Sequence, residues 1–358
     1  MIKGYTLWLV SLFLLPFFQG GYYDHQVLLF GLIQAGIFLR NYKRLGNAIF
    51  DIKKSYLIGI LFALFVSFFF ALDQSKHWIG ILRFSVSFLF FLILSHCFEQ
   101  NPIKVKKDLM KVVVSGAFLM SFSVIWGMLL FQEHSIGGFF VQRGRIGGFF
   151  QYANSFAAYL FGAQLLLLHQ MEREKKFHFI DLGLVVVIQI GIALTQSRAL
   201  ILINVIFLFL SAIWLLRAAL ASFMGLLIGQ GILTFFISNS NPQRALQISV
   251  SSSEWLSRLL YYEDGLHMIW VRPFGYGHLG YYYAQRYYQS GASYHVKFIH
   301  NGALQLALDF GLPLLLLLVY FFFKVLRKGI NDWQGKKILI LGTIGFFGHC
   351  LVDINLQF

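Results

Sequence analysis

Long apolar segments separated by short basic loops are the feature that most restricts how this chain folds. Of its 358 residues, 58% are hydrophobic and only 12% are charged. A soluble domain carries about a quarter charged residues to cover its surface, so a globular fold in water is excluded. Helices are suited to the bilayer because they satisfy their own backbone hydrogen bonds. The sequence therefore predicts an all-α, polytopic integral membrane protein.

The apolar segments predict about eleven transmembrane helices, since a helix needs about 20 apolar residues to cross the hydrocarbon core. We expect one membrane domain over residues 1–358, with spans at 5–18, 26–39, 56–72, 78–98, 110–131, 152–169, 179–194, 199–216, 218–237, 302–324 and 338–352. The first two are short and are able to form one helical hairpin. Only Arg217 divides 199–216 from 218–237.

Lysine and arginine gather in alternate loops, which is the pattern of cytoplasmic loops. The basic stretches lie at 40–54, 104–111, 173–176, 217 and 327–337. With eleven spans they all fall on one side, which places the N-terminus in the cytoplasm and the C-terminus outside. This distribution also accounts for the formal charge of +14 without nucleic acid as a partner.

The largest loop, residues 238–299, is predicted to lie outside the membrane. Loops of this size usually carry function. Ser251 and Glu254 have the spacing of a capping box and predict a helix that runs to Trp270, before Pro273. The tyrosines that follow are suited to the lipid headgroups or to stacking on sugars, and they lie at positions 281–283, 287 and 288.

The predicted outer loops contain more arginines than the topological bias allows. Guanidinium groups bind phosphate or carboxylate through two parallel hydrogen bonds, so a bound anion explains the set, although a headgroup contact or a salt bridge is an alternative for each member. Few outer carboxylates are available to pair with them. These arginines are Arg143, Arg145, Arg198, Arg244, Arg258, Arg272 and Arg286.

His300 and Asn301 stand at the outer mouth of the 302–324 span. Asn301 is placed to cap that helix, whose N-terminal amides favour an anion. His300 has the pKa range of a general base, and a helix-end histidine making one hydrogen bond is the alternative. Asp309 is an intramembrane acid, which indicates function by default. His349 and Asp353 are four residues apart and are expected to share a helix face.

Four groups of residues together resemble the O-antigen ligase/polymerase superfamily, that is, the WaaL-like ligases and the Wzy-like polymerases. They are the run from Arg143 to Phe149 with Tyr152-Ala153-Asn154; Thr195-Gln196-Ser197-Arg198; Arg258 with Asp264-Gly265 and Arg272 to Gly277; and His300-Asn301 followed by Gly311-Leu312-Pro313. The resemblance covers roughly the C-terminal half to two thirds of the chain. The earlier spans match the family only in hydropathy.

The resemblance implies a fold similar to the GT-C membrane glycosyltransferases, in a bacterial cytoplasmic membrane. The enzyme would take a glycan from a polyprenyl-diphosphate carrier and pass it to a glycan or glycolipid acceptor on the extracytoplasmic face, alongside other polysaccharide-assembly proteins. It would need no metal and no cofactor. The implied catalytic residues are His300, Arg198 and Arg272. Diphosphate binding falls to Arg143, Arg145, Arg258 and Asn301, and Asp264, Asp309 and Asp353 are secondary candidates.

Two departures from the family pattern bear on the type of enzyme. The ligase pattern often continues with Gly, Thr or Tyr where this chain has Leu314, which favours a polymerase over a ligase. The family usually has a further helix after the last span, whereas this sequence stops at Phe358. A transporter or flippase is the alternative function, but it predicts internal repeats and broken helices in both halves. A non-catalytic assembly protein leaves the outer arginines and His300 unexplained.

Overall fold

A computed structural model describes residues 2–43, 45, 54–131, 141–142, 145–175, 178–236, 253–291 and 293–353. The longer helices are α1 (Tyr5–Leu14), α2 (Asp24–Arg40), α4 (Lys54–Phe70), α5 (Gln74–Gln100), α6 (Pro102–Phe131), α8 (Ala153–Glu174), α9 (Phe179–Leu194), α10 (Arg198–Phe236), α11 (Ser253–Val271), α14 (Leu312–Asn331) and α15 (Lys337–Cys350). The shorter elements are η1 (Leu15–Phe17), α12 (Gly280–Ala284), η3 (Gln285–Tyr287), α13 (Gly302–Phe310) and the antiparallel strands β1 (Val141–Gln142) and β2 (Arg145–Ile146).

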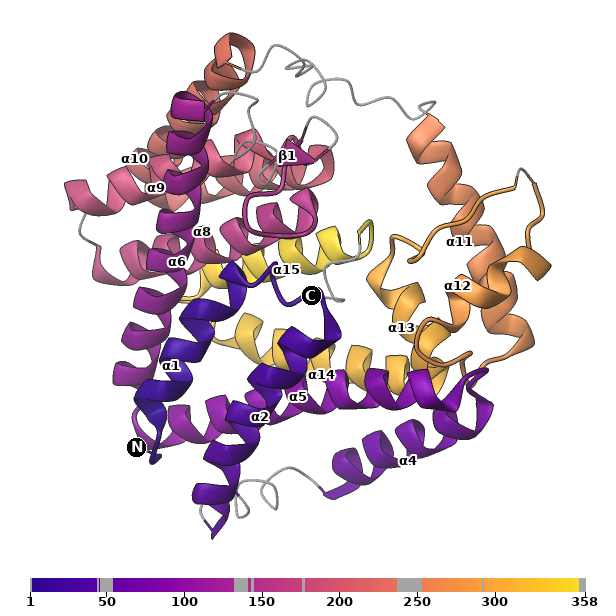
Figure 1. The fold of residues 1–358 in the computed structure, drawn as a ribbon. Coiled ribbons are helices and arrows are strands. Elements are labelled where there is room, and N and C mark those ends of the chain that lie inside the picture. Colours follow the sequence, from indigo (N-terminus) through magenta and orange to yellow (C-terminus); the bar gives the residue numbers. More distant parts are fainter. Residues whose placement is uncertain are drawn as a thin grey trace.

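The helices pack around several apolar cores rather than one, and Figure 1 shows how the helices are arranged. The largest core joins α6, α8, α9, α10 and α15. The helices α1, α2, α5 and the start of α6 share a second core. A third lies within the large loop and α13, and the fourth joins α4, α5 and α14 with the end of α13. The two short N-terminal helices do pack against each other, as the sequence predicted.

Large apolar side chains cover the outward faces of several helices. Phe65 on α4 is 61% exposed, Phe209 on α10 is 65% exposed and Leu227 on the same helix is 73% exposed. Contiguous apolar exposure of this kind is unfavourable in water and normal against lipid. Within the described residues, three helices (α5, α6 and α10) are long and apolar enough to cross a membrane, and α1, α4, α9 and α15 are shorter apolar helices. These helices support a membrane protein, while the count of eleven spans and their orientation stay predictions.

Residues 198–236 carry one label, α10, but they form two helical segments that meet at a kink, in keeping with the two spans predicted on either side of Arg217. Leu215 leaves the helical region, with φ −134° and ψ 51°, and kinks the helix there. The kink lies two residues from Arg217, which the sequence indicated as the turn.

The prediction of a single helix over residues 302–324 is wrong, because the helix breaks at Gly311. Gly311 has φ 85° and ψ 164°, a backbone region that is essentially reserved for glycine. Pro313 follows in the first turn of α14, where its missing N–H costs nothing. The break separates α13, which carries Asn301 and Asp309 at or near its ends, from α14.

The segment after α11 closes this break and satisfies its backbone groups. Tyr276 N donates to Leu308 O over 2.6 Å, and Leu312 N donates to Pro273 O over 2.8 Å. A Cβ on Gly311 would lie 2.7 Å from the carbonyl carbon of Phe274. The Arg272–Gly277 motif is therefore the piece of chain that fits against the interrupted helix.

We expect Gly311→Ala to destabilise the protein more than Gly335→Ala. Both glycines have positive φ, but a Cβ on Gly335 meets nothing within 4 Å, whereas one on Gly311 meets the Phe274 backbone. Strain of this kind costs about 1–3 kcal/mol, and overpacking costs a similar amount again. Thermal unfolding in detergent checks the difference. Equal melting temperatures for the two variants would show that the contact with Phe274 is unimportant.

Candidate functional site

A buried carboxylate, Asp353, gathers polar side chains from three distant parts of the chain. Asp353 lies in the turn after α15 and is fully buried. Its Oδ2 accepts a hydrogen bond from Asn154 Nδ2 at the start of α8 and lies 3.7 Å from Arg258 Nη2 on α11. Its Oδ1 lies 3.7 Å from His300 Nδ1. We call these four residues together with Arg145 the Asp353 cluster.

Arg145 enters the cluster through Asn154. Its Nη2 donates to Asn154 Oδ1, and its Nε donates to the Thr195 carbonyl over 3.3 Å. Thr195 begins the buried turn that leads into α10, and Arg198 is the first residue of that helix. The structure thus brings Arg145 and Asn154 to the same place as the Thr195–Arg198 motif.

The backbone of His300 is held in an unusual conformation. Its φ is 57°, a left-handed value that is uncommon for residues other than glycine and occurs at functional sites. The Tyr262 hydroxyl on α11 donates to the His300 carbonyl over 2.8 Å, and Gln305 Oε1 accepts from the preceding Ile299 N over 3.0 Å. Asn301 Oδ1 caps α13 by accepting from Leu304 N over 3.0 Å, which confirms the predicted cap.

The electrostatic balance of the cluster favours an anion. Two guanidinium groups, on Arg145 and Arg258, face one carboxylate. Burial alone would raise the pKa of Asp353, but His300 and the positive Arg258 outweigh it and hold that pKa below its usual range. Asp353 therefore stays ionised at neutral pH, and the cluster keeps an excess of positive charge. The side chains of Arg258 and His300 are 22% and 25% exposed, so a ligand has access to both.

Other predicted site residues lie apart from this cluster. Arg272 follows the end of α11, about 20 Å along the helix axis from Arg258 at 1.5 Å per residue. Its Nη2 donates to Phe70 O at the end of α4 over 2.9 Å, and its guanidinium carbon stacks 5.2 Å from the centre of the Tyr276 ring. Arg143 and Arg244 lie outside the described residues, as does the capping-box residue Ser251, and Arg286 is exposed on η3.

The secondary candidates Asp264 and Asp309 have structural partners away from His300. Asp264 accepts hydrogen bonds from Ser290 N (3.0 Å), Ser290 Oγ (2.6 Å) and the Tyr294 hydroxyl (2.8 Å), which ties the large loop together. Asp309 accepts from Gln305 Nε2 over 3.0 Å and lies 3.8 Å from His278 Nδ1. Of the three secondary candidates, only Asp353 lies in the cluster.

Sequence reasoning missed three residues of the site. Asn154 bridges Arg145 and Asp353, and its Nδ2 also donates to the Tyr152 hydroxyl over 2.9 Å. The Tyr152 ring lies 6.3 Å from the His300 ring, and Tyr262 holds the His300 carbonyl. Tyr152 and Asn154 were visible as part of a motif, but nothing in the spacing of α11 pointed to Tyr262. Among the described residues, no group of three or more His, Cys, Asp or Glu is arranged to hold a metal.

The fold and the cluster define a class, namely helical membrane proteins with a polar site rich in arginine and containing histidine. In a comparison with family models, residues 182–319 are similar to the model described as O-Antigen ligase. The matched region runs from α9 into α14 and contains Arg198, Arg258, Arg272 and His300, whereas Arg145, Asn154 and Asp353 lie outside it. The match confirms the resemblance to the O-antigen ligase/polymerase superfamily. No curated protein and no solved structure matches the chain in the corresponding comparisons.

Asp353→Asn is expected to destabilise the protein in a pH-dependent way. Because the folded pKa lies below the unfolded value of about 3.9, the carboxylate contributes stability above that pH and loses it as the pH falls through the folded pKa. Removing one partner of a buried ion pair costs about 3–5 kcal/mol. The gap in melting temperature between wild type and variant should therefore be largest at neutral pH and shrink below about pH 4.

Asp332→Asn is the matched control, because Asp332 is 63% exposed and pairs only with the nearby Lys336 among the described residues. Its melting temperature should follow that of the wild type at every pH. A gap for Asp353→Asn that does not change with pH would rule out an ionised Asp353 as the source of the stability.

Proposed function

We propose that this protein transfers an oligosaccharide from a polyprenyl-diphosphate carrier to an acceptor hydroxyl on the extracytoplasmic face of a bacterial cytoplasmic membrane. The observation that carries the proposal is the Asp353 cluster, which holds two arginines and a histidine around one buried carboxylate. The O-antigen ligase match over residues 182–319 supports the same reaction at the level of the family. Surface polysaccharides such as O-antigen, capsule or exopolysaccharide are the products that fit this chemistry.

In this proposal the donor diphosphate binds beside Arg145 and Arg258. Guanidinium groups make bidentate hydrogen bonds to phosphate oxygens, and a partly desolvated site strengthens their attraction. Arg198, at the start of α10, and the amides next to Asn301 at the start of α13 would complete the grip. Arginine supplies the positive charge that stabilises the leaving diphosphate, so the proposal invokes no metal ion.

His300 would act as the general base for the acceptor. Asp353 Oδ1 lies 3.7 Å from His300 Nδ1, so a negative charge stands beside the imidazole and stabilises its charged form. The acceptor oxygen attacks the anomeric carbon and forms the new glycosidic bond. The bond from that carbon to the diphosphate oxygen breaks, the hydroxyl proton passes to His300, and the polyprenyl diphosphate leaves with the electron pair.

Arg272 keeps its proposed catalytic role on the resemblance alone. Its contact with the end of α4 places it at the other end of α11 from the Asp353 cluster. A polymerase, which adds one lipid-linked repeat to another, is favoured over a ligase by Leu314. No contact in the described residues favours the transporter alternative.

Deleting the gene should change the lipid-linked glycans of the cell in a diagnostic way. For a polymerase, single repeat units on polyprenyl diphosphate accumulate and longer chains disappear, because the joining step is lost. For a ligase, long lipid-linked chains persist and fail to reach their acceptor. Mass spectrometry of the extracted lipids checks both outcomes. Unchanged lipid-linked glycans would refute the proposed function.

Substitutions in the Asp353 cluster should separate general-base catalysis from diphosphate binding. His300→Gln removes the base and should lower the turnover number about 10²–10⁴-fold, the usual contribution of general base catalysis. Arg258→Gln weakens the grip on the diphosphate and should raise the KM for the lipid-linked donor as well. In vitro transfer with purified donor lipid measures both constants.

The large loop offers a matched control for each substitution. His295→Gln changes an exposed histidine five residues before His300, and Arg286→Gln changes an exposed arginine outside the cluster. Both controls should keep transfer within about twofold of wild type, since each loses only surface contacts. Activity retained in His300→Gln, or lost equally in His295→Gln, would remove His300 from the mechanism.

A further inference from the structure

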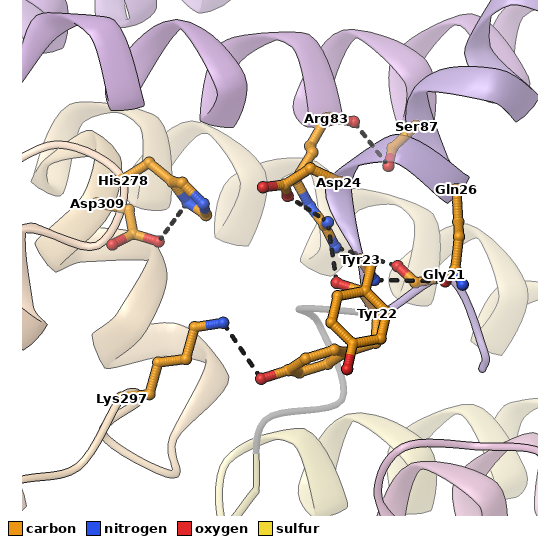
Figure 2. Close-up of polar contacts among 10 residues, drawn as sticks. All are labelled: Gly21, Tyr22, Tyr23, Asp24, Gln26, Arg83, Ser87, His278, Lys297 and Asp309. Atoms are coloured by element: carbon orange, nitrogen blue, oxygen red, sulfur yellow. Dashed lines mark hydrogen bonds and ion pairs between the residues drawn. The ribbon is translucent and has the colours of Figure 1, made fainter.

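A polar cavity separate from the Asp353 cluster lies between the N-terminal helices and the large loop (Figure 2). Its volume is about 60 Å³, and its walls include Tyr22, Asp24, Arg83, His278, Lys297 and Phe298. The side chains of His278 and Lys297 face those of Arg83, Asp24 and Tyr22 across this space. Lys297 is exposed and Asp24 is partly exposed, so the cavity is open to solvent. None of these residues belongs to the Asp353 cluster.

The polar groups around the cavity are fixed in place before any ligand binds. Arg83 Nη1 lies 2.9 Å from Asp24 Oδ1, and the same atom donates to the Tyr22 carbonyl over 3.3 Å. His278 Nδ1 lies 3.8 Å from Asp309 Oδ2, and the backbone N of His278 donates to His77 Nδ1 over 3.0 Å. Side chains held in this way lose little conformational freedom on binding, which favours affinity.

Lys297 is held by aromatic groups. Its Nζ donates to the Tyr22 hydroxyl over 3.1 Å and lies 4.8 Å from the centre of the Tyr22 ring and 5.1 Å from that of Phe298. The cavity therefore combines charged hydrogen-bond donors with aromatic surface.

The chemistry of the walls fits a polyhydroxylated ligand better than a simple anion. Arg83 is paired with Asp24, whose carboxylate also lines the cavity and disfavours a simple anion, and Lys297 adds one positive charge that lies against aromatic rings. The walls offer donors on Arg83, Lys297 and the Tyr22 hydroxyl, together with an acceptor on Asp24. A sugar hydroxyl both donates and accepts. A water-sized group needs about 10–15 Å³ of such volume, so the cavity has room for a few hydroxyl groups along one edge of a sugar ring.

The chain connects this cavity to the Asp353 cluster on two sides. Lys297 precedes His300 by three residues, which can span at most about 10 Å of chain. On the other side, Gln19 forms a β-bridge with Phe150, and Phe150 lies between Arg145 and Tyr152 in the sequence. A glycan whose reacting end lies at His300 is therefore within reach of the cavity.

We propose that this cavity is a sugar-binding subsite, which holds one sugar unit of the glycan while its reacting end lies at His300. The assignment rests on the proposed transfer function and adds to it a recognition site for the glycan itself, separate from the diphosphate. In this role Arg83 helps to select the sugar and takes no part in bond breaking.

Two probes applied to the purified full chain in lipid nanodiscs test the subsite. The first is a single repeat-unit oligosaccharide prepared from the surface polysaccharide of the cell, free of lipid and phosphate. The second is inorganic diphosphate. Tyr22→Phe and Lys297→Gln each remove hydrogen-bonding capacity in the cavity, and each should weaken oligosaccharide binding about three- to tenfold. Both should leave diphosphate binding within about twofold, whereas Arg258→Gln should weaken diphosphate binding instead.

Lys76→Gln is the matched control for Lys297→Gln. Lys76 Nζ makes the same kind of contact elsewhere, donating to the Tyr283 hydroxyl over 2.6 Å and lying 4.1 Å from the centre of that ring. It does not line the cavity, so its loss should change neither affinity. Equal weakening by Lys76→Gln would show that the effect of Lys297→Gln reflects general loop stability and would overturn the subsite.

The remaining outcomes separate the subsite from the transfer function. Oligosaccharide binding that survives both cavity substitutions overturns the subsite and leaves transfer intact. If the wild-type protein binds diphosphate but not the oligosaccharide, the subsite is also overturned and the transfer function is left intact. The glycan profile of the deletion strain decides transfer separately, because that measurement does not depend on the cavity.

Discussion

The buried charge of Asp353 is the constraint on which the arrangement of the site depends. Moving a carboxylate out of water costs several kcal/mol unless partners compensate it. Here the partners come from α8, α11 and the loop before α13, so these segments must meet where the carboxylate lies. The position of Arg258 and His300 beside one another is thus tied to the stability of the fold. A single requirement both orders the helices and assembles the groups that the proposed chemistry uses.

The broken helix at Gly311 shows a second constraint at work. Irregular backbone at membrane depth is tolerated only where protein or a water-filled cavity satisfies it. The Pro273–Tyr276 segment supplies those partners through two backbone hydrogen bonds, so this segment anchors the large loop to the helices. The short helix α13 then ends with Asp309 buried next to His278.

Most of the helices could be predicted because their long apolar segments are recognisable from hydropathy alone. The helix of the large loop was also predictable, since Pro273 limits its end, and Asn301 is a cap by residue type. The break at Gly311 was not, because Phe310, Leu312 and Leu314 keep the hydropathy continuous across it. Similarly, His349 and Asp353 do not share one helix, since α15 ends at Cys350.

The types of residue in the site could be predicted from the sequence, but which of them lie together could not. Arginines against the topological bias, and a histidine at a helix mouth, indicated Arg145, Arg258 and His300. Which acid would join them depended on tertiary packing, so Asp264, Asp309 and Asp353 were indistinguishable until the fold placed the first two elsewhere. Tyr262 acts through the backbone carbonyl of His300, a contact that no spacing in the sequence reveals.

Arg258 and Tyr262 lie one turn apart on the same face of α11. The first contacts Asp353 and the Val352 carbonyl, and the second holds the His300 carbonyl. A tilt or rotation of α11 therefore cannot alter one contact without altering the other. Under the proposed function, diphosphate binding at Arg258 and the orientation of His300 are therefore coupled through α11.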